Sequence, residues 1–237
     1  MLVTNEPMTC AMKIECVTSD FLMNDDVSAI TAIRIKRKND KNEMETLGEF
    51  AVPVAGNLNF LVRDYSARAG KTYSYYAIPL IGNREGVGAK RDAKSEFREL
   101  FIGNGDKQFA CGLNMQYTYQ LHHSASYVQT YYSRYPHAIH NGNMRYATGS
   151  VTGLFLRRDA RGEFIKDGAH DHKEELLEFL TDGKPKVMKT PEGHMWHVSI
   201  DGEPKEDESE YIGASTVTFA WTETGPADDS LSSAEFL

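Results

Sequence analysis

The sequence lacks the features that mark secreted, membrane-spanning and cysteine-rich proteins. Its three cysteines, Cys10, Cys16 and Cys111, form no C-x-x-C unit, and an odd number in 237 residues argues against a disulfide framework. No stretch approaches the roughly 18 apolar residues of a membrane-spanning helix. The first residues also lack the basic start and long apolar run of a signal peptide. We therefore expect a soluble chain, made in the cytoplasm, whose thiols are free and buried.

An excess of basic residues is also lacking. Lys and Arg number 26 against 34 Asp and Glu, which gives a net charge of -8. Tight binding to nucleic-acid phosphates needs a surplus of positive charge, so we expect no nucleic-acid partner. With 41% apolar residues, the 237-residue chain has enough apolar material for two packed domains.

Sequence patterns of common catalytic sites are missing as well. There is no G-x-S-x-G nucleophile elbow, no G-x-x-x-x-G-K-[ST] phosphate loop and no cysteine in a recognised pattern with histidine. The histidines include the pairs His170 and His172, His194 and His197, and His122 and His123. An H-x-x-H spacing on a strand sends its side chains to opposite faces, whereas zinc ligands must converge. We predict no catalytic residue, no metal and no cofactor, and keep a glycoside hydrolase as a third alternative.

What the chain does contain is a series of short alternating runs that are typical of β-strands. Residues 29–38 (AITAIRIKRK) alternate apolar and polar side chains before an Asn-Asp turn. Residues 71–81 (KTYSYYAIPLI) put Tyr73 and Tyr75 on one face and Tyr76 on the other. Because both faces of this second run are apolar, we predict a strand in the middle of a sheet.

Residues 60–86, FLVRDYSARAGKTYSYYAIPLIGNREG, resemble the end of a fibronectin type III domain. Both have a strand, a glycine-containing corner and a strand opened by a tyrosine. In such β-sandwiches the hydroxyl of a corner tyrosine bonds to backbone upstream and fixes the crossover between the sheets. Tyr73, three positions after Gly70, lies where that residue would fall. The resemblance implies a fibronectin type III-like β-sandwich over residues 1–98.

The second part of the chain is also read as strands, with one helix. We predict strands at 146–156, 186–189, 194–200 and 217–221 and a turn at Asn141-Gly142-Asn143. Residues 172–180 (HKEELLEFL) have helical periodicity, with Asp171 as the N-cap and Asp182-Gly183 as the stop. The polar, acidic residues 225–237 are expected to form a flexible tail or to lie on a partner.

Residues 99–224 resemble a domain of bacteriophage tail and baseplate proteins. The resemblance rests on YPHAIHNGNMRYATGSVTGLFL, EELLEFLTDGKPKVMK, EGHMWHVSI and TFAWTE. It implies a β-sandwich or split-barrel domain with one helix and a hairpin, repeated around a ring. The fold class we predict is therefore mainly β: a fibronectin type III-like β-sandwich followed by a β-sandwich or split-barrel domain with one helix.

The segment between residues 117 and 135 contains more tyrosines than one segment of a core would hold. We therefore expect an interface or a ligand site there, with these candidates: Tyr127, Tyr131, Tyr132, Tyr135 and, outside the stretch, Trp196.

The predicted function is that of a structural, non-enzymatic subunit of a phage tail or baseplate. It would form a ring of identical copies, bind other virion proteins and reside in the virion after assembly in the host cytoplasm. The alternative is a carbohydrate-binding module that stacks exposed Tyr and Trp rings on a host-surface glycan.

Overall fold

The computed structural model describes residues 1–6, 10–24, 26–39, 41–104, 107–123, 126–139, 145–159, 162–165, 167–207, 215–226 and, for the backbone, 232–236. The fold is mainly β, as predicted, and the strands pair antiparallel throughout the described residues. The predicted turn at Asn141-Gly142-Asn143 lies outside the described residues.

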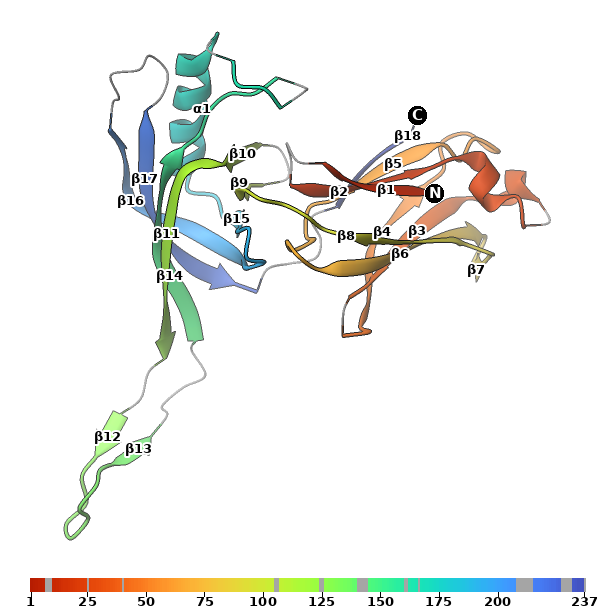
Figure 1. Cartoon of the computed structure of the whole chain (residues 1–237). Coiled ribbons are helices and arrows are strands. Elements are labelled where there is room, and N and C mark those ends of the chain that lie inside the picture. The colour runs from red at the N-terminus through yellow and green to blue at the C-terminus, as the bar shows by residue number, and fades with distance from the viewer. Residues whose placement is uncertain are drawn as a thin grey trace.

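The first half of the chain, together with the last strand, forms two sheets that face each other. One sheet has the strand order β1 (Leu2–Glu6), β2 (Ala11–Cys16), β5 (Phe60–Asp64), β18 (Ser232–Phe236). The other has the order β4 (Met44–Ala51), β3 (Ala32–Lys38), β6 (Thr72–Ile81), with both β7 (Arg84–Glu85) and β8 (Ala89–Lys94) paired to β6. Side chains of both sheets, such as Ile14 and Ile33, belong to one buried cluster. The two sheets therefore enclose a common core (Figure 1).

Strand β6 lies in the middle of its sheet, as predicted. Tyr73 and Tyr75 share one face, also as predicted, and this face is buried, whereas Tyr76 on the other face is half-buried. The Tyr73 hydroxyl accepts a hydrogen bond from the backbone N–H of Arg68, five residues upstream, at 3.0 Å. This is the backbone bond expected of a corner tyrosine. It ties the start of β6 to the loop that follows β5.

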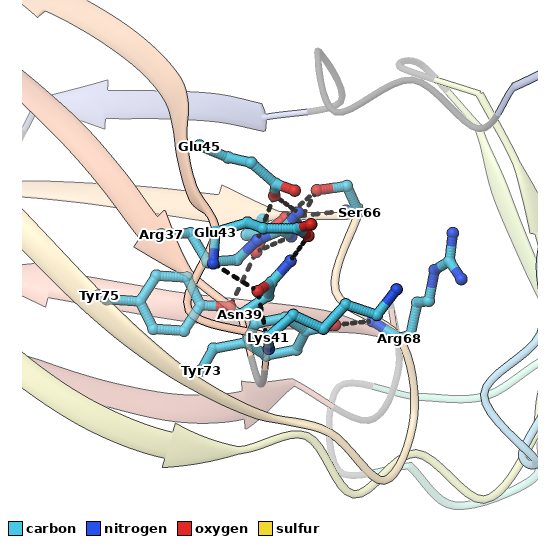
Figure 2. Close-up of polar contacts among 10 residues, drawn as sticks. Arg37, Asn39, Lys41, Glu43, Glu45, Ser66, Arg68, Tyr73 and Tyr75 are labelled. Atoms are coloured by element: carbon cyan, nitrogen blue, oxygen red, sulfur yellow. Dashed lines mark hydrogen bonds and ion pairs between the residues drawn. The ribbon is translucent and has the colours of Figure 1, made fainter.

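Strand β3 follows its predicted alternation, but its third inward position is a cation. Ile33, Ile35 and Arg37 all point inward and are buried. The Arg37 guanidinium donates to Asp64 at 2.9 Å. It also donates to Glu45 at 2.5 Å and to Ser66 at 2.7 Å, both of which Figure 2 labels beside Arg37. Asp64 also accepts from the Tyr75 hydroxyl at 2.8 Å. Because each buried charge is paired, arginine is tolerated where the pattern calls for an apolar side chain.

The second half of the chain forms a seven-stranded sheet. Its strand order is β10 (Gln108–Cys111), β9 (Leu100–Gly103), β15 (Lys186–Lys189), β16 (Met195–Asp207), β17 (Thr216–Gly225), β14 (Arg145–Leu154), β11 (Leu113–His123). Gly149 of β14 is required by a close approach, since a Cβ there would lie 1.9 Å from the carbonyl oxygen of Thr118 on β11. This sheet supports both the helix and the projecting arm.

The helix α1 (Ala169–Thr181) covers the sheet with Leu176, Phe179 and Leu180, which are buried. Within the described ranges α1 is the only α-helix. The predicted N-cap at Asp171 is wrong, because the helix starts at Ala169 with Gly168 in the left-handed region as its cap. The helix is therefore three residues longer at its start than the apolar pattern indicated.

Lys189 of β15 joins the two halves of the chain. Its ammonium donates to the carbonyl oxygens of Cys10 at 2.5 Å and Ala67 at 3.2 Å, and it lies 5.0 Å from the ring centroid of Phe97. A second contact occurs at Gly193, where a Cβ would lie 2.7 Å from the carbonyl oxygen of Ala69. These contacts fix how the second sheet meets the end of the sandwich.

The last residues differ from the expectation of a flexible tail. Strand β18 (Ser232–Phe236) pairs antiparallel with β5, so the chain end returns to the first half. Without it β5 would be an edge strand, and the unpaired backbone groups of an edge attract another strand. Here that strand comes from the same chain.

Candidate functional site

The tyrosine-rich segment forms an arm that projects from the body of the protein. Strands β12 (Ser126–Val128) and β13 (His137–Ile139) pair with each other in a separate two-stranded sheet, beyond the ends of β11 and β14 (Figure 1). We call residues 126–139 the arm. Every residue of the arm except Ser133 is exposed. Both faces of this hairpin are therefore in solvent, with no core of their own.

Four of the predicted candidate residues lie on this arm. The exposed fractions are 71% for Tyr127, 90% for Tyr131, 98% for Tyr132 and 71% for Tyr135. The rings of Tyr131 and Tyr132 meet edge to face, with centroids 4.7 Å apart. Arg134 lies beside them, its guanidinium 5.8 Å from the ring centroid of Tyr135. The arm thus presents aromatic surface and one permanent positive charge together.

The backbone at the tip of the arm is strained in order to place these rings. The N–H of Ser133 donates to the carbonyl oxygen of Thr130 at 3.1 Å and closes a turn. Tyr132, the third residue of that turn, has φ 76°, in the left-handed region where glycine or asparagine is favoured. Strain at a bulky residue is typical of functional sites. Two adjacent tyrosines at such a tip favour a surface role over a purely structural turn.

The fifth candidate, Trp196, does not meet the expectation of an exposed ring. Its side chain is 8% exposed and lies 5.0 Å from the Trp221 ring, centroid to centroid. His194 stacks on Trp196 at 5.1 Å, and Tyr119 of β11 packs against both rings. Trp196 therefore belongs to the core of the second half and lies on a different element from the arm tyrosines.

Groups with strongly shifted pKa values are buried inside structural networks. Burial would raise the pKa of Asp64, but the charge of Arg37 and the bonds from Ser66 and Tyr75 lower it. The pKa of Tyr75 is raised well above its usual value by burial and then by the Asp64 charge. Burial lowers the pKa of Lys189 to about 8. These groups are paired with one another or with backbone carbonyls, which suits a structural role.

The three cysteines are free and buried, as predicted. Burial raises the pKa of the thiol to about 11 for Cys10, about 12 for Cys16 and about 11 for Cys111. A thiol with so high a pKa is a poor nucleophile at neutral pH.

The described part of the chain contains no group of three or more His, Cys, Asp or Glu side chains placed to hold a metal ion. None of the helices in that part combines the length and apolar character needed to cross a bilayer.

Comparisons with known proteins find partial likeness to chains of gene transfer agent particles. No protein-family model matches the sequence, and no curated protein matches it. One similar solved structure is a chain from the virion of a native gene transfer agent particle: 15% identity, TM-score 0.33, covering 53% of this chain and 91% of that chain. Another is a chain from the tail of an empty gene transfer agent particle with C6 symmetry: 15% identity, TM-score 0.33, covering 58% and 95%. A TM-score of 0.33 establishes neither the fold nor the function of this chain.

Sequence reasoning missed Arg134 and the isolation of the arm. The signal for Arg134 was present, since it lies between the predicted candidates Tyr132 and Tyr135. The isolation of the arm depends on where β11 and β14 leave the seven-stranded sheet, which residue types alone do not encode.

Proposed function

We propose that the chain is a structural, non-enzymatic subunit of a bacteriophage tail, baseplate or phage-tail-like particle, and that it acts by binding other protein subunits. The observation that carries this proposal is the arm with its four exposed tyrosines. A lone two-stranded hairpin is only marginally stable in water. Burying the rings against a partner would stabilise the arm and supply the aromatic contacts that are enriched in protein interfaces.

The architecture supports an assembly built from repeated copies. Strands β10 and β11 are the two edges of the seven-stranded sheet, so backbone groups are available for pairing at both ends. The mainly β fold with helix α1 accords with the resemblance of residues 99–224 to tail and baseplate domains. We propose a ring of identical copies, in contact with other tail proteins of the virion and assembled in the host cytoplasm.

We also propose that the chain has two domains, divided near residue 98, with a fibronectin type III-like first domain. Support comes from the two facing sheets, the corner bond of Tyr73 and the two separate buried clusters. The clusters meet at β9, where Phe101 belongs to the first and Leu100 to the second. The proposed tail from residue 225 then includes β18, which returns to the first domain.

The test is the state of association of the full chain. Sedimentation velocity over a wide concentration range should show concentration-dependent oligomers, and electron microscopy of the same sample should show rings or tubes. Replacing Tyr131 and Tyr132 together by Ser should reduce the oligomers, because these rings are almost fully exposed. A matched control is Tyr76→Ser, on the body of the protein.

Two outcomes would overturn the proposal. The first is a chain that stays monomeric at every concentration and is absent from purified particles by mass spectrometry. The second is a monomer that binds selected sugars on a glycan array and loses that binding when Tyr131 or Tyr132 is changed to Ala. That result would favour a carbohydrate-binding module.

A further inference from the structure

Two neighbouring strands of the seven-stranded sheet separate near the root of the arm. The last residue pair between β14 and β17 is Thr148 with Thr222. Beyond that pair, β14 extends back to Arg145 and is paired only with β11, while β17 runs on to Gly225 and is paired only with β16. Figure 1 shows β14 leading toward the arm from this point while β17 turns aside. A wedge-shaped gap therefore opens between the two strands.

This gap is an open cleft with a volume of about 740 Å³. Its walls are Arg145 and Tyr146 of β14 and residues 222–226 at the end of β17. Volumes of roughly 300 to 1,000 Å³ are typical of sites that hold a ligand. We call this hollow the root cleft. Among the described residues, none that lines it belongs to the arm.

The backbone along the root cleft does not need an added strand. The N–H of Ala147 on β14 faces β17, and the carboxylate of Glu223 accepts its hydrogen bond at 2.8 Å. This side chain takes the place of the missing strand partner, so the buried donor is satisfied. An occupant that adds side chains therefore fits the cleft better than one that adds a further β-strand.

The threonine hydroxyls of the root cleft are also bonded within the sheet. The hydroxyl of Thr222 donates to Asp201 at 2.5 Å, and that of Thr224 lies 3.3 Å from Nδ1 of His197. The ring of Tyr146 remains as contact surface for an occupant. A saccharide needs several free polar partners, whereas an aromatic side chain is held mainly by the burial of its ring. The walls therefore favour an aromatic side chain.

Tyr146 gives the root cleft a fixed aromatic wall. Its ring stacks on that of His122 of β11, with the centroids 5.0 Å apart and the planes 16° from parallel. His122 is held in turn by the Thr148 hydroxyl, 2.7 Å from its Nε2. The exposed Arg145 lies at the same wall, and a guanidinium attracts the face of an aromatic ring.

We propose that the root cleft of one copy receives Tyr131 and Tyr132 from the arm of a second copy. This inference rests on the proposed function and names its contact. The two rings, which we call the tip rings, are 90% and 98% exposed and meet edge to face at 4.7 Å. Aromatic anchors that fill a pocket supply much of the binding energy of protein interfaces. Because the arm leads away from its own root cleft (Figure 1), the rings that fill the cleft come from another copy.

Two variants that each lack one side of the contact provide the test. Tyr131→Ser with Tyr132→Ser removes the tip rings and keeps the cleft, whereas Thr224→Trp fills the cleft and keeps the tip rings. Each variant alone should self-associate at least about tenfold more weakly than the unmodified chain in sedimentation equilibrium. An equimolar mixture should associate at least about tenfold more tightly than either variant alone, because the tip rings of one variant can enter the cleft of the other.

A matched control is Ala220→Trp, which places the same side chain on the same face of β17 and outside the root cleft. It should leave association unchanged. Thermal melting followed by circular dichroism should be similar for all variants, because Tyr131, Tyr132, Ala220 and Thr224 are exposed.

A second measurement records the contact by cross-linking. A Tyr132→Cys chain mixed with a Thr224→Cys chain should form a mixed disulfide on air oxidation, identified by mass spectrometry of the linked peptides. The three natural thiols are buried and should contribute little background. Ala220→Cys in place of Thr224→Cys should form much less of the mixed disulfide.

Four outcomes would overturn the inference. If the unmodified chain associates and Thr224→Trp associates equally well, the cleft is not the contact and the proposed function stands. If the mixture associates no better than the separate variants and no mixed disulfide forms, the tip rings and the cleft do not meet. If the unmodified chain never associates, the proposed function fails and the contact with it. If Thr224→Trp abolishes binding to a glycan array and leaves self-association unchanged, the cleft holds a saccharide.

Discussion

The ammonium of Lys189 donates a hydrogen bond to the backbone carbonyl oxygen of Cys10, at 2.5 Å, across the junction between the two halves of the chain. The lysine comes from β15 of the seven-stranded sheet and the carbonyl from the turn before β2. Among the described residues no carboxylate pairs with this ammonium, which is fully buried between the rings of Phe97 and Phe101. The junction therefore depends on a cation held only by carbonyl oxygens and aromatic faces.

The burial of the Lys189 ammonium predicts that the free energy of unfolding depends on pH. Burial lowers the pKa of Lys189 from 10.5 to about 8 in the folded state. Between these values the unfolded chain still binds the proton and the folded chain does not, so this group raises the free energy of unfolding as pH increases from 8 to 10.5. The full effect is about 3 kcal/mol. The raised pKa values of the buried thiols lower the stability of any variant in the same way above pH 9. In urea unfolding at pH 7 and pH 10, the stability of the unmodified chain relative to that of Lys189→Met should therefore increase with pH.

The matched control for that prediction is Lys94→Met, since Lys94 is exposed and pairs with the exposed Glu96. This variant should retain the pH dependence of the unmodified chain. The same pH dependence in Lys189→Met as in the unmodified chain would show that Lys189 is not responsible.

The buried pair of Arg37 and Asp64 predicts a large loss of stability when one partner is removed. Arg37→Met leaves the carboxylate of Asp64 buried without a counter-ion, which should cost about 3 to 5 kcal/mol in urea unfolding at pH 7. In the unmodified chain the pKa of Asp64 is lowered, so its stabilising effect is lost as pH falls through that lowered pKa. In the variant, burial raises the pKa of Asp64. The stability of the variant should therefore fall as pH rises above about 4.

The double variant Arg37→Met with Asp64→Asn provides the control, because it removes both charges. It should recover part of the lost stability and show no decrease between pH 4 and pH 7. A single variant as stable as the unmodified chain would mean that water reaches Asp64 in solution.

The corner bond of Tyr73 should contribute measurably to the first half. Tyr73→Phe removes the acceptor of the Arg68 N–H and leaves that donor without its 3.0 Å partner. The expected loss is about 1 to 2 kcal/mol in urea unfolding. Tyr76→Phe, on the opposite face of the same strand, should change stability by less than about 0.5 kcal/mol. Equal effects of the two substitutions would contradict the role assigned to the Tyr73 hydroxyl.

Replacing Tyr132 at the tip of the arm by glycine should stabilise the tip and weaken association between copies. Glycine adopts the left-handed conformation of Tyr132 freely, so Tyr132→Gly should relieve about 1 kcal/mol of local strain. The same change removes an almost fully exposed ring and should weaken oligomers in sedimentation velocity. Tyr132→Phe keeps the ring and should associate like the unmodified chain. Full association of the glycine variant would exclude this ring from the interface.

Local sequence patterns predicted several of the strands and the helix, because alternation and helical periodicity reflect which side chains are buried. The runs at 71–81 and 186–189 correspond to β6 and β15, and the run at 172–180 lies within α1. The N-cap was placed three residues late, because Ala169, His170 and Asp171 lack an apolar pattern and the cap is a glycine with positive φ. The tail at 225–237 gave no strand signal, because the pairing of β18 depends on the distant strand β5.

The sequence predicted which residue types form the candidate site. It did not predict where in the fold these residues lie. The concentration of tyrosines between residues 117 and 135 is a property of the sequence, and it led to the four exposed residues of the arm. Trp196 could not be separated from them by sequence, since a tryptophan on a strand suits a core and a surface equally. Its burial depends on Trp221 of the neighbouring strand β17, which lies 25 positions further along the chain.

By itself the sequence determined the β-rich class, the helix, the free thiols and the acid-free, tyrosine-rich segment, because each depends on residues close together in the chain. Only the tertiary structure decided that Arg37 could be buried, that Lys189 joins the two halves and that the tyrosines lie on a projecting hairpin. The physical reason is that burial and charge pairing depend on partners tens to more than a hundred residues away, which no local pattern specifies.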